Sequence, residues 1–232
     1  MKKLIIIPAY NEGKNIQNVI YKIQEHAKDY DYIIINDGST DNTEQVCKDN
    51  NFNYVSLPKN LGIGGAVQTG YKYAKEYDYD VAIQFDGDGQ HDVQYLDLLV
   101  EQIENGADIC IGSRYIDKQG FQSTYVRRLG KNIISLVIKC LCGKKITDPT
   151  SGFRACNKKV IHMFANKYPD EYPEPETIVR ILTNQHLLIE VPVIMNERQA
   201  GKSSITPIKS LKYMLKVIIS IVFAKLEGKE KR

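Results

Sequence analysis

Short apolar runs alternate with helical periodicities along the first half of the chain. The runs have the length of strands that are buried on both faces, and they are Leu4–Ile7, Tyr32–Ile35, Asn53–Leu57, Val81–Phe85 and Ile109–Ile111. Between them, apolar residues recur every three or four positions, which is typical of helices with one buried face; the first such set is Ile16, Val19, Ile20 and Ile23. This alternation predicts an α/β fold, Rossmann-like, with a mostly parallel sheet flanked by helices.

The second half of the chain loses this alternation. It contains a basic, helix-like stretch at residues 127–145, a loop signal at Asp148–Gly152 and one further strand candidate at Leu187–Val191. In open parallel sheets, ligands bind beyond the carboxyl ends of the strands. Polar clusters follow those ends in this sequence, so we expect the functional site there.

The segment of residues 206–226 has the pattern of an amphipathic helix. Three lysines fall on one narrow stripe of the helical projection, namely Lys209, Lys212 and Lys216, and the remaining face is broadly apolar. The longest uncharged run, residues 217–224, is too short to span a bilayer. We therefore expect a domain at residues 1–205 and an amphipathic basic extension at residues 206–232, which lies in the membrane plane or binds a small membrane protein. The alternative is that this helix buries its apolar face on the core of the domain.

Charge is distributed unevenly along the chain. The net charge of +3 over 232 residues gives no argument for nucleic acid, but residues 200–232 hold eight Lys/Arg against two Glu, which makes them +6 and the rest −3. A basic tail favours an anionic membrane surface as partner. The five cysteines lack zinc-ligand spacing, and the N-terminal apolar run is too short for a signal peptide. We expect a cytoplasmic protein that is peripheral at the inner face of the cell membrane.

The sharpest chemical signal is Asp86-Gly-Asp88, at the end of a predicted strand. Two carboxylates one residue apart can present oxygens to Mg²⁺ or Mn²⁺, which keeps open positions for substrate phosphates. An Asp/Gly-rich turn that begins the next helix would produce the same local pattern. Glu12 and Asp37 follow neighbouring predicted strands, and this convergence favours a metal and phosphate site over a simple turn.

Together these motifs resemble the family 2 glycosyltransferases of the GT-A fold. The general resemblance rests on Pro8-Ala-Tyr-Asn-Glu12, Asn36-Asp-Gly-Ser-Thr-Asp41 and Asp86-Gly-Asp88. The sequence is most similar to the polyprenyl-phosphate glycosyltransferases, the group that includes dolichol-phosphate mannose synthases. That likeness rests on Asp86–His91, Gly112–Arg114, Asp148–Arg154, Glu190–Pro192, and Arg198 with Gly201–Ser203, and it covers residues 3–205.

The resemblance implies a role for each matching position. Residues of the nucleotide pocket would be Pro8, Ala9, Tyr10, Asn11, Glu12, Asp37 and Asp86. The metal on the diphosphate, Mg²⁺ or Mn²⁺, would be held by Asp86, Asp88 and Gln90. Residues that handle phosphate of the acceptor would be Arg114, Arg128, Lys131, Ser135, Arg198 and Lys202. Glu176 matches an acidic residue near the sugar. The catalytic set would be Asp86, Asp88, Arg114, Glu176 and Arg198. The family usually has arginine at position 131, and Arg128, one helical turn earlier, could substitute for it.

The implied function is metal-dependent, inverting transfer of one sugar from a UDP- or GDP-sugar to a polyprenyl phosphate, for synthesis of cell-envelope glycans. A phosphate acceptor is already anionic and needs cations to position it rather than a strong base. Transfer to a sugar hydroxyl or a lipid-linked saccharide is the alternative, and it would need a general base, with Glu176 as the candidate. A non-catalytic nucleotide-sugar-binding subunit is a further alternative, which the intact Asp86 and Asp88 disfavour.

Overall fold

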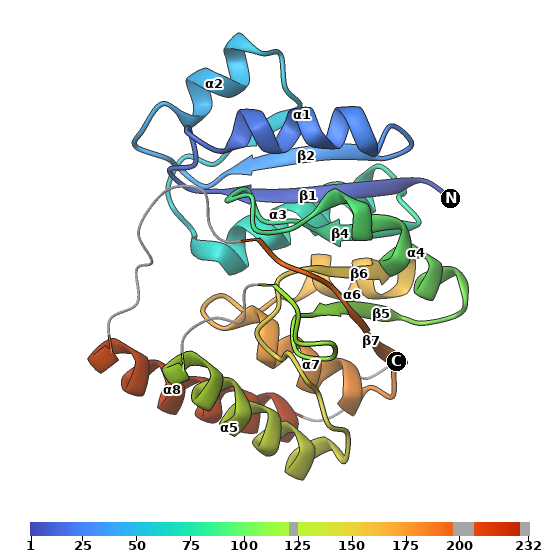
Figure 1. Cartoon of the computed structure of the whole chain (residues 1–232), viewed down its shortest axis with the longest axis vertical. Helices are drawn as coiled ribbons and strands as arrows, with labels where there is room; N and C mark the ends of the chain where they lie inside the picture. The colour runs from blue at the N-terminus through green and yellow to red at the C-terminus, as the bar shows by residue number, and fades with distance from the viewer. Residues whose placement is uncertain (121–124, 197–206, 228–232) are drawn as a thin grey trace.

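A seven-stranded sheet runs through the middle of the protein (Figure 1). The computed structural model describes residues 1–120, 125–196 and 207–227. The strands are β1 (Lys3–Ala9), β2 (Asp31–Asn36), β3 (Tyr54–Ser56), β4 (Val81–Gln84), β5 (Ile109–Ser113), β6 (Arg154–Asn157) and β7 (Leu188–Pro192), in the spatial order β3-β2-β1-β4-β6-β5-β7. Each pair of neighbours is parallel except those that involve β6, which is antiparallel to β4 and β5. The predicted α/β fold is confirmed.

Helices cover both faces of the sheet because alternate strand residues point to opposite sides. Ile5 and Ile7 of β1 pack in one core cluster, whose helical partners come from α1 (Ile16–His26), α2 (Thr43–Asp49) and α4 (Leu96–Glu104). Leu4 and Ile6 pack in the other. The helices on that face are α3 (Gly62–Glu76), α5 (Tyr125–Cys142), α6 (Lys158–Asn166), α7 (Pro173–Thr183) and α8 (Pro207–Leu226).

Because β6 is antiparallel, the loop before it lies at the edge of the sheet where the parallel strands end. Its first residue, Arg154, pairs with Gln84 near the carboxyl end of β4 and with Ile111 on β5. The carboxyl end of β5 pairs in turn with that of β7, where Ser113 lies opposite Pro192. The loop that leads into β6 therefore lies at the same sheet edge as the loops that follow β1, β2, β4, β5 and β7. We call this the carboxyl edge.

Helix α8 packs against α5 and α7 (Figure 1). Val217, Ile221 and Ala224 on one side of it are buried in the core cluster shared with those helices. Beyond its end, Glu227 forms salt bridges with Arg180 of α7 and with Lys167. One side of the amphipathic segment thus lies on the core, while its other side is exposed. Within the described ranges, no helix is long and apolar enough to cross a membrane.

Candidate active site

The loops that follow β1 and β2 are joined at the carboxyl edge by Asn11. Its backbone lies in the left-handed region, with φ of 57°, which asparagine adopts more readily than most residues. In this conformation its N–H donates to Ser39 Oγ at 3.0 Å, and its Oδ1 accepts from the Thr40 N–H at 2.8 Å. Asn11 therefore shapes this part of the edge by holding two loops together.

Two acidic residues expected in the nucleotide pocket are buried beside this junction. Asp37 Oδ1 accepts from the Leu61 N–H at 2.7 Å and so fixes the chain where α3 begins. Glu12 Oε2 accepts from Asn15 Nδ2 at 2.7 Å. Pro8 and Ala9 end β1, and the following Tyr10 is 47% exposed, so its ring is open to a ligand.

The loop after β4 is held in shape by His91, which sequence reasoning did not assign to the site. His91 Nδ1 accepts from the Asp86 N–H at 2.9 Å, and its ring stacks on Phe153 at 4.7 Å. Burial lowers the pKa of His91 to about 4, so the ring is neutral at physiological pH. Because Nδ1 is an acceptor, the proton lies on Nε2, 3.5 Å from Asp86 Oδ2. His91 thus positions both the backbone and the carboxylate of Asp86.

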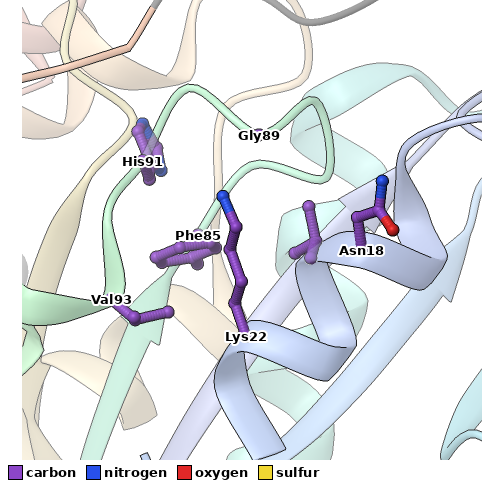
Figure 2. A pocket seen from close by; sticks show the side chains of 7 residues that line it. Asn18, Lys22, Phe85, Gly89, His91 and Val93 are labelled. Carbon is purple, nitrogen blue, oxygen red and sulfur yellow. The ribbon is translucent and has the colours of Figure 1, made fainter. Parts of the chain in front are cut away.

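The pocket in Figure 2 lies on the α1 side of this same loop. Its lining includes Phe85, Gly89 and His91 of the loop region, and Lys22 extends toward them from α1. None of the residues expected to bind donor or acceptor lines it. We therefore place the candidate site at the carboxyl edge and not in this pocket.

Asp88 and Gln90 continue the loop beyond Asp86. Asp88 is nearly buried, and its Oδ1 accepts from the Gln90 N–H at 3.0 Å. Gln90 is joined to Asn196 by two hydrogen bonds, one of which runs from the Asn196 N–H to the Gln90 carbonyl at 2.9 Å. Residues 197–206, which contain Arg198 and Lys202, lie outside the described residues. Asn196, the last described residue before that segment, therefore lies beside Gln90, one of the metal-binding candidates.

The donor set of this loop fits a hard divalent cation. Asp86, Asp88 and the Gln90 amide provide oxygen ligands, which Mg²⁺ and Mn²⁺ prefer. The described residues contain no cluster of three or more His, Cys, Asp or Glu side chains that could enclose a metal. A metal shared with a diphosphate needs only one or two protein carboxylates, since phosphate oxygens complete its coordination. The residues present therefore fit a substrate-bridging metal rather than a closed structural site.

A second cluster at the carboxyl edge centres on an ion pair. Arg114, directly after β5, makes a two-pronged contact with the fully buried Asp148, with Nε to Oδ2 at 2.7 Å and Nη2 to Oδ1 at 2.9 Å. Burial alone would lower the pKa of Arg114, but the hydrogen bonds and charge of Asp148 raise it. Glu190 of β7 supports the pair by accepting from the N–H groups of Thr147 and Asp148. Three separate sequence motifs thus form one network.

Lys131 of α5 joins this cluster from above the Tyr115 ring, with its Nζ 4.1 Å from the ring centroid. Burial lowers the pKa of Lys131, against the opposing attraction of Asp148 and Glu190. The Ser135 hydroxyl donates to the carbonyl of Ile146, and so ties α5 to the loop that carries Asp148. Arg128 is exposed one turn before Lys131. The residues expected to handle the acceptor phosphate, so far as the structure describes them, therefore lie in one region around α5 and β5.

The two acidic residues of α7, Glu174 and Glu176, have different partners. Glu176 Oε1 accepts from Arg180, with Nη2 at 2.8 Å, and its Oε2 accepts from Ser220, so this residue joins α7 to α8. Burial raises the pKa of Glu174, while the charge of Arg154 lowers it and the charge of Asp86 raises it further. Glu174 is therefore a further candidate for the site, which the family resemblance did not assign.

The fold and this edge define a class of protein. A mostly parallel sheet of this order, with joined loops after β1 and β2 and an Asp-x-Asp loop after β4, is that of a glycosyltransferase of the GT-A fold. The family model for glycosyl transferase family 2 matches residues 4–164, and the chain belongs to that family. The protein is a family 2 glycosyltransferase, as the sequence motifs predicted.

Similar proteins include enzymes with polyprenyl-phosphate acceptors in their names. The chain is 33% identical over 210 residues to the UDP-N-acetylglucosamine–dolichyl-phosphate N-acetylglucosaminyltransferase of Methanococcus voltae, covering 82% of this chain and 83% of that protein. It is 26% identical to the polyprenol monophosphomannose synthase of Mycolicibacterium smegmatis, over 93% of this chain and 85% of that one.

Solved structures support the fold. Glucosyl-3-phosphoglycerate synthase from Mycobacterium tuberculosis, in complex with Mn²⁺, UDP and phosphoglyceric acid, superimposes with a TM-score of 0.73 at 18% identity, over 99% of this chain and 80% of that chain. At this identity the comparison establishes the architecture alone.

Proposed function

We propose that this glycosyltransferase moves one sugar, with inversion, from a nucleotide sugar to a polyprenyl phosphate in a metal-dependent reaction. The observation that carries the proposal is the presence of two clusters at one sheet edge. The Asp86–Gln90 loop offers oxygen ligands, and the Arg114–Asp148 pair with Lys131 offers cations held in fixed positions. Such a pair of clusters suits an anionic leaving group and an anionic nucleophile.

On the donor side, the proposed ligands are Asp86, Asp88 and Gln90. When bound, Mg²⁺ or Mn²⁺ would neutralise the charge that develops on the departing nucleoside diphosphate. His91 keeps the Asp86 carboxylate oriented, and Tyr10 offers an exposed ring against which a nucleotide base can stack. We favour UDP over GDP, because the Methanococcus relative is named for a UDP-sugar and the mycobacterial structure contains UDP.

On the acceptor side, we propose that Arg114 and Lys131 bind the phosphate and aim an oxygen at the sugar. Arg198 and Lys202 are further candidates from the segment that follows Asn196. Asp148 fixes the Arg114 guanidinium, so the cation is positioned before the acceptor arrives and less ordering is needed on binding. An anionic phosphate needs no base to remove a proton.

The engagement of Glu176 favours a phosphate acceptor over a hydroxyl. Both carboxylate oxygens of Glu176 accept hydrogen bonds, from Arg180 and from Ser220, so this candidate base for a hydroxyl acceptor is committed to contacts within α7 and with α8. A protein that only binds nucleotide sugars would not need the Arg114 and Lys131 cluster. We further propose that the enzyme works at the inner face of the cell membrane, with residues 206–232 contributing to attachment, in the synthesis of cell-envelope glycans.

The test is transfer to a water-soluble, short-chain polyprenyl phosphate from a panel of UDP- and GDP-sugars, with Mn²⁺ or Mg²⁺. We expect a sugar phosphate product of inverted configuration, and loss of turnover in EDTA. Asp88→Asn should lower kcat by about 10²–10³-fold, which is the usual effect of removing one group that stabilises the charge developing in a transition state. The matched control is Asp78→Asn, an exposed aspartate paired with Lys158. Near-normal turnover in Asp88→Asn or in EDTA would refute the metal assignment, and a product formed only on hydroxyl acceptors would refute the acceptor.

A further inference from the structure

Two cations proposed to bind the acceptor phosphate contact the same aromatic ring. Lys131 Nζ is 4.1 Å from the centroid of the Tyr115 ring, and the guanidinium carbon of Arg114 is 5.5 Å from it. A cation within about 6 Å of a ring centroid is attracted by the electron-rich face of the ring. Tyr115, which follows Arg114 directly, is therefore a shared contact of Arg114 and Lys131.

The position of Tyr115 is fixed by hydrogen bonds at the end of β5. Its N–H donates to Ser113 Oγ at 3.2 Å, and that hydroxyl lies 2.6 Å from Thr147 Oγ1. Thr147 Oγ1 in turn donates to Glu190 Oε1 at 2.8 Å. The side chain of Tyr115 is half-buried. The ring therefore meets Lys131 from a backbone that strand ends and a loop hold in place.

Arg114 and Lys131 differ in how their charge is compensated. Arg114 is paired with the buried Asp148 at 2.7 Å, whereas Lys131 forms no salt bridge with any residue that the structure describes. Asp148 and Glu190 act on Lys131 as more distant charges, against the burial that lowers its pKa. An aromatic face attracts an ammonium group without neutralising it. A carboxylate in the place of the ring would compete with a phosphate for the same cation.

We propose that Tyr115 is a positioning residue, whose ring holds Lys131 where the phosphate of the acceptor binds and leaves its charge available to that phosphate. The inference rests on the proposed function, since the ligand of Lys131 is taken to be the acceptor phosphate. A free lysine side chain has many rotamers, and ordering them costs free energy on binding. Because the ring orders Lys131 beforehand, less of this cost falls on the binding step.

The test is calorimetric binding of the water-soluble, short-chain polyprenyl phosphate, together with transfer kinetics, in Tyr115→Phe and Tyr115→Leu. Phenylalanine keeps the ring and removes the hydroxyl, whereas leucine removes the ring. We expect Tyr115→Phe to stay within about twofold of the wild type, and Tyr115→Leu to raise the acceptor Kd and KM about three- to thirtyfold, which is the range of a partly desolvated contact between a cation and a ring. The donor KM should stay unchanged in both variants.

Tyr73→Leu is the matched control for the loss of a tyrosine. Tyr73 is also half-buried, but its ring packs against Tyr77, whose carbonyl accepts from Lys2 at the opposite end of β1. This variant should bind the acceptor phosphate as the wild type does.

A double-mutant cycle with Lys131→Gln distinguishes positioning from a general structural effect. If the ring acts through Lys131, the effect of Tyr115→Leu on the acceptor Kd should shrink to less than about twofold in the Lys131→Gln background. Residues that act independently would instead show the same fold-change in both backgrounds.

Four results would overturn the proposal for Tyr115. They are no binding of the phosphate by the wild type, a wild-type Kd in Tyr115→Leu, an equal loss in Tyr115→Phe, and an undiminished loss in the Lys131→Gln background. If the wild type binds the phosphate but transfers no sugar to it, the proposed function fails, whereas the Kd values of the variants still judge the role of Tyr115.

Discussion

Gly152 offers a sensitive test of how the Asp86 carboxylate is held. A Cβ built at this position would lie 3.1 Å and 3.2 Å from the two carboxylate oxygens of Asp86 and 2.9 Å from Gln84 Nε2. Ordinary contacts begin near 3.4 Å, so Gly152→Ala must displace the carboxylate or the amide by a few tenths of an ångström. The backbone of Gly152 is not in the left-handed region, so alanine adds a contact without backbone strain.

The expected effect falls on activity more than on stability. A misplacement of about 1 Å in an active site can cost about 100-fold, so a few tenths of an ångström correspond to a loss of roughly three- to tenfold in kcat/KM. Overpacking costs about 1–3 kcal/mol, but the change from glycine returns about 0.4–1 kcal/mol by restricting the unfolded chain. The net change in the free energy of unfolding should therefore be about 2 kcal/mol or less.

The assay is transfer to the soluble acceptor at a range of Mn²⁺ concentrations, together with urea unfolding. If Asp86 contacts the metal, Gly152→Ala should also raise the Mn²⁺ concentration needed for half-maximal rate. Gly130→Ala serves as control, since its Cβ also meets an atom at 2.9 Å, but that atom belongs to the flexible Met214 side chain. Wild-type kcat/KM in Gly152→Ala, or equal losses in the two variants, would refute the reasoning.

Two further predictions concern buried ionisable side chains, His91 and the Arg114–Asp148 pair. Burial holds the pKa of His91 at about 4 against 6.5 for the free side chain, so the unfolded state binds the proton first as pH falls. The free energy of unfolding should therefore fall by about 2 kcal/mol between pH 7 and pH 5 because of this residue. Urea unfolding of His91→Gln should show a pH dependence that is smaller by this amount. The same pH dependence in the variant and the wild type would contradict the prediction. Asp148→Asn leaves the largely buried Arg114 without its ion pair and should cost about 3–5 kcal/mol in urea unfolding, so a loss below about 1 kcal/mol would contradict the importance of the pair.

The parts of the fold that the sequence predicted are those with strong hydrophobic patterns. β1 and β2 lie inside the sheet and are buried from Leu4 and from Ile33 onward, so these residues form apolar runs that differ clearly from a solvated segment. By contrast, β6 has only four residues and begins with Arg154. That arginine is fully buried because its guanidinium donates to the Ser151 carbonyl and to Thr177 Oγ1. No local hydrophobic pattern predicts such a strand, because the buried guanidinium is satisfied by the preceding loop and by α7.

Glu174 and Glu176 illustrate a placement that the sequence does not determine. Residues two positions apart on a helix point about 200° away from each other, so one acid of the pair can face the carboxyl edge only if the other faces away. The packing of α7 decides which of the two acids faces the carboxyl edge. Arg154 contacts the first turn of α7 through the Glu174 carbonyl, and Ser220 of α8 contacts it through Glu176. The sequence contains both acids but not that packing.

The antiparallel insertion of β6 explains how the two halves of the site are coupled. Because β6 runs against its neighbours, the loop from Asp148 to Gly152 enters the carboxyl edge between β4 and β5. One end of this loop holds Arg114 through Asp148, while the other end packs Gly152 against the Asp86 carboxylate. A parallel strand in the same position would carry this loop to the opposite edge. Asp86, the proposed metal ligand, and Arg114, the proposed acceptor cation, are therefore linked through one five-residue segment. We expect a change at either end of this segment to alter the position of the residue at the other end.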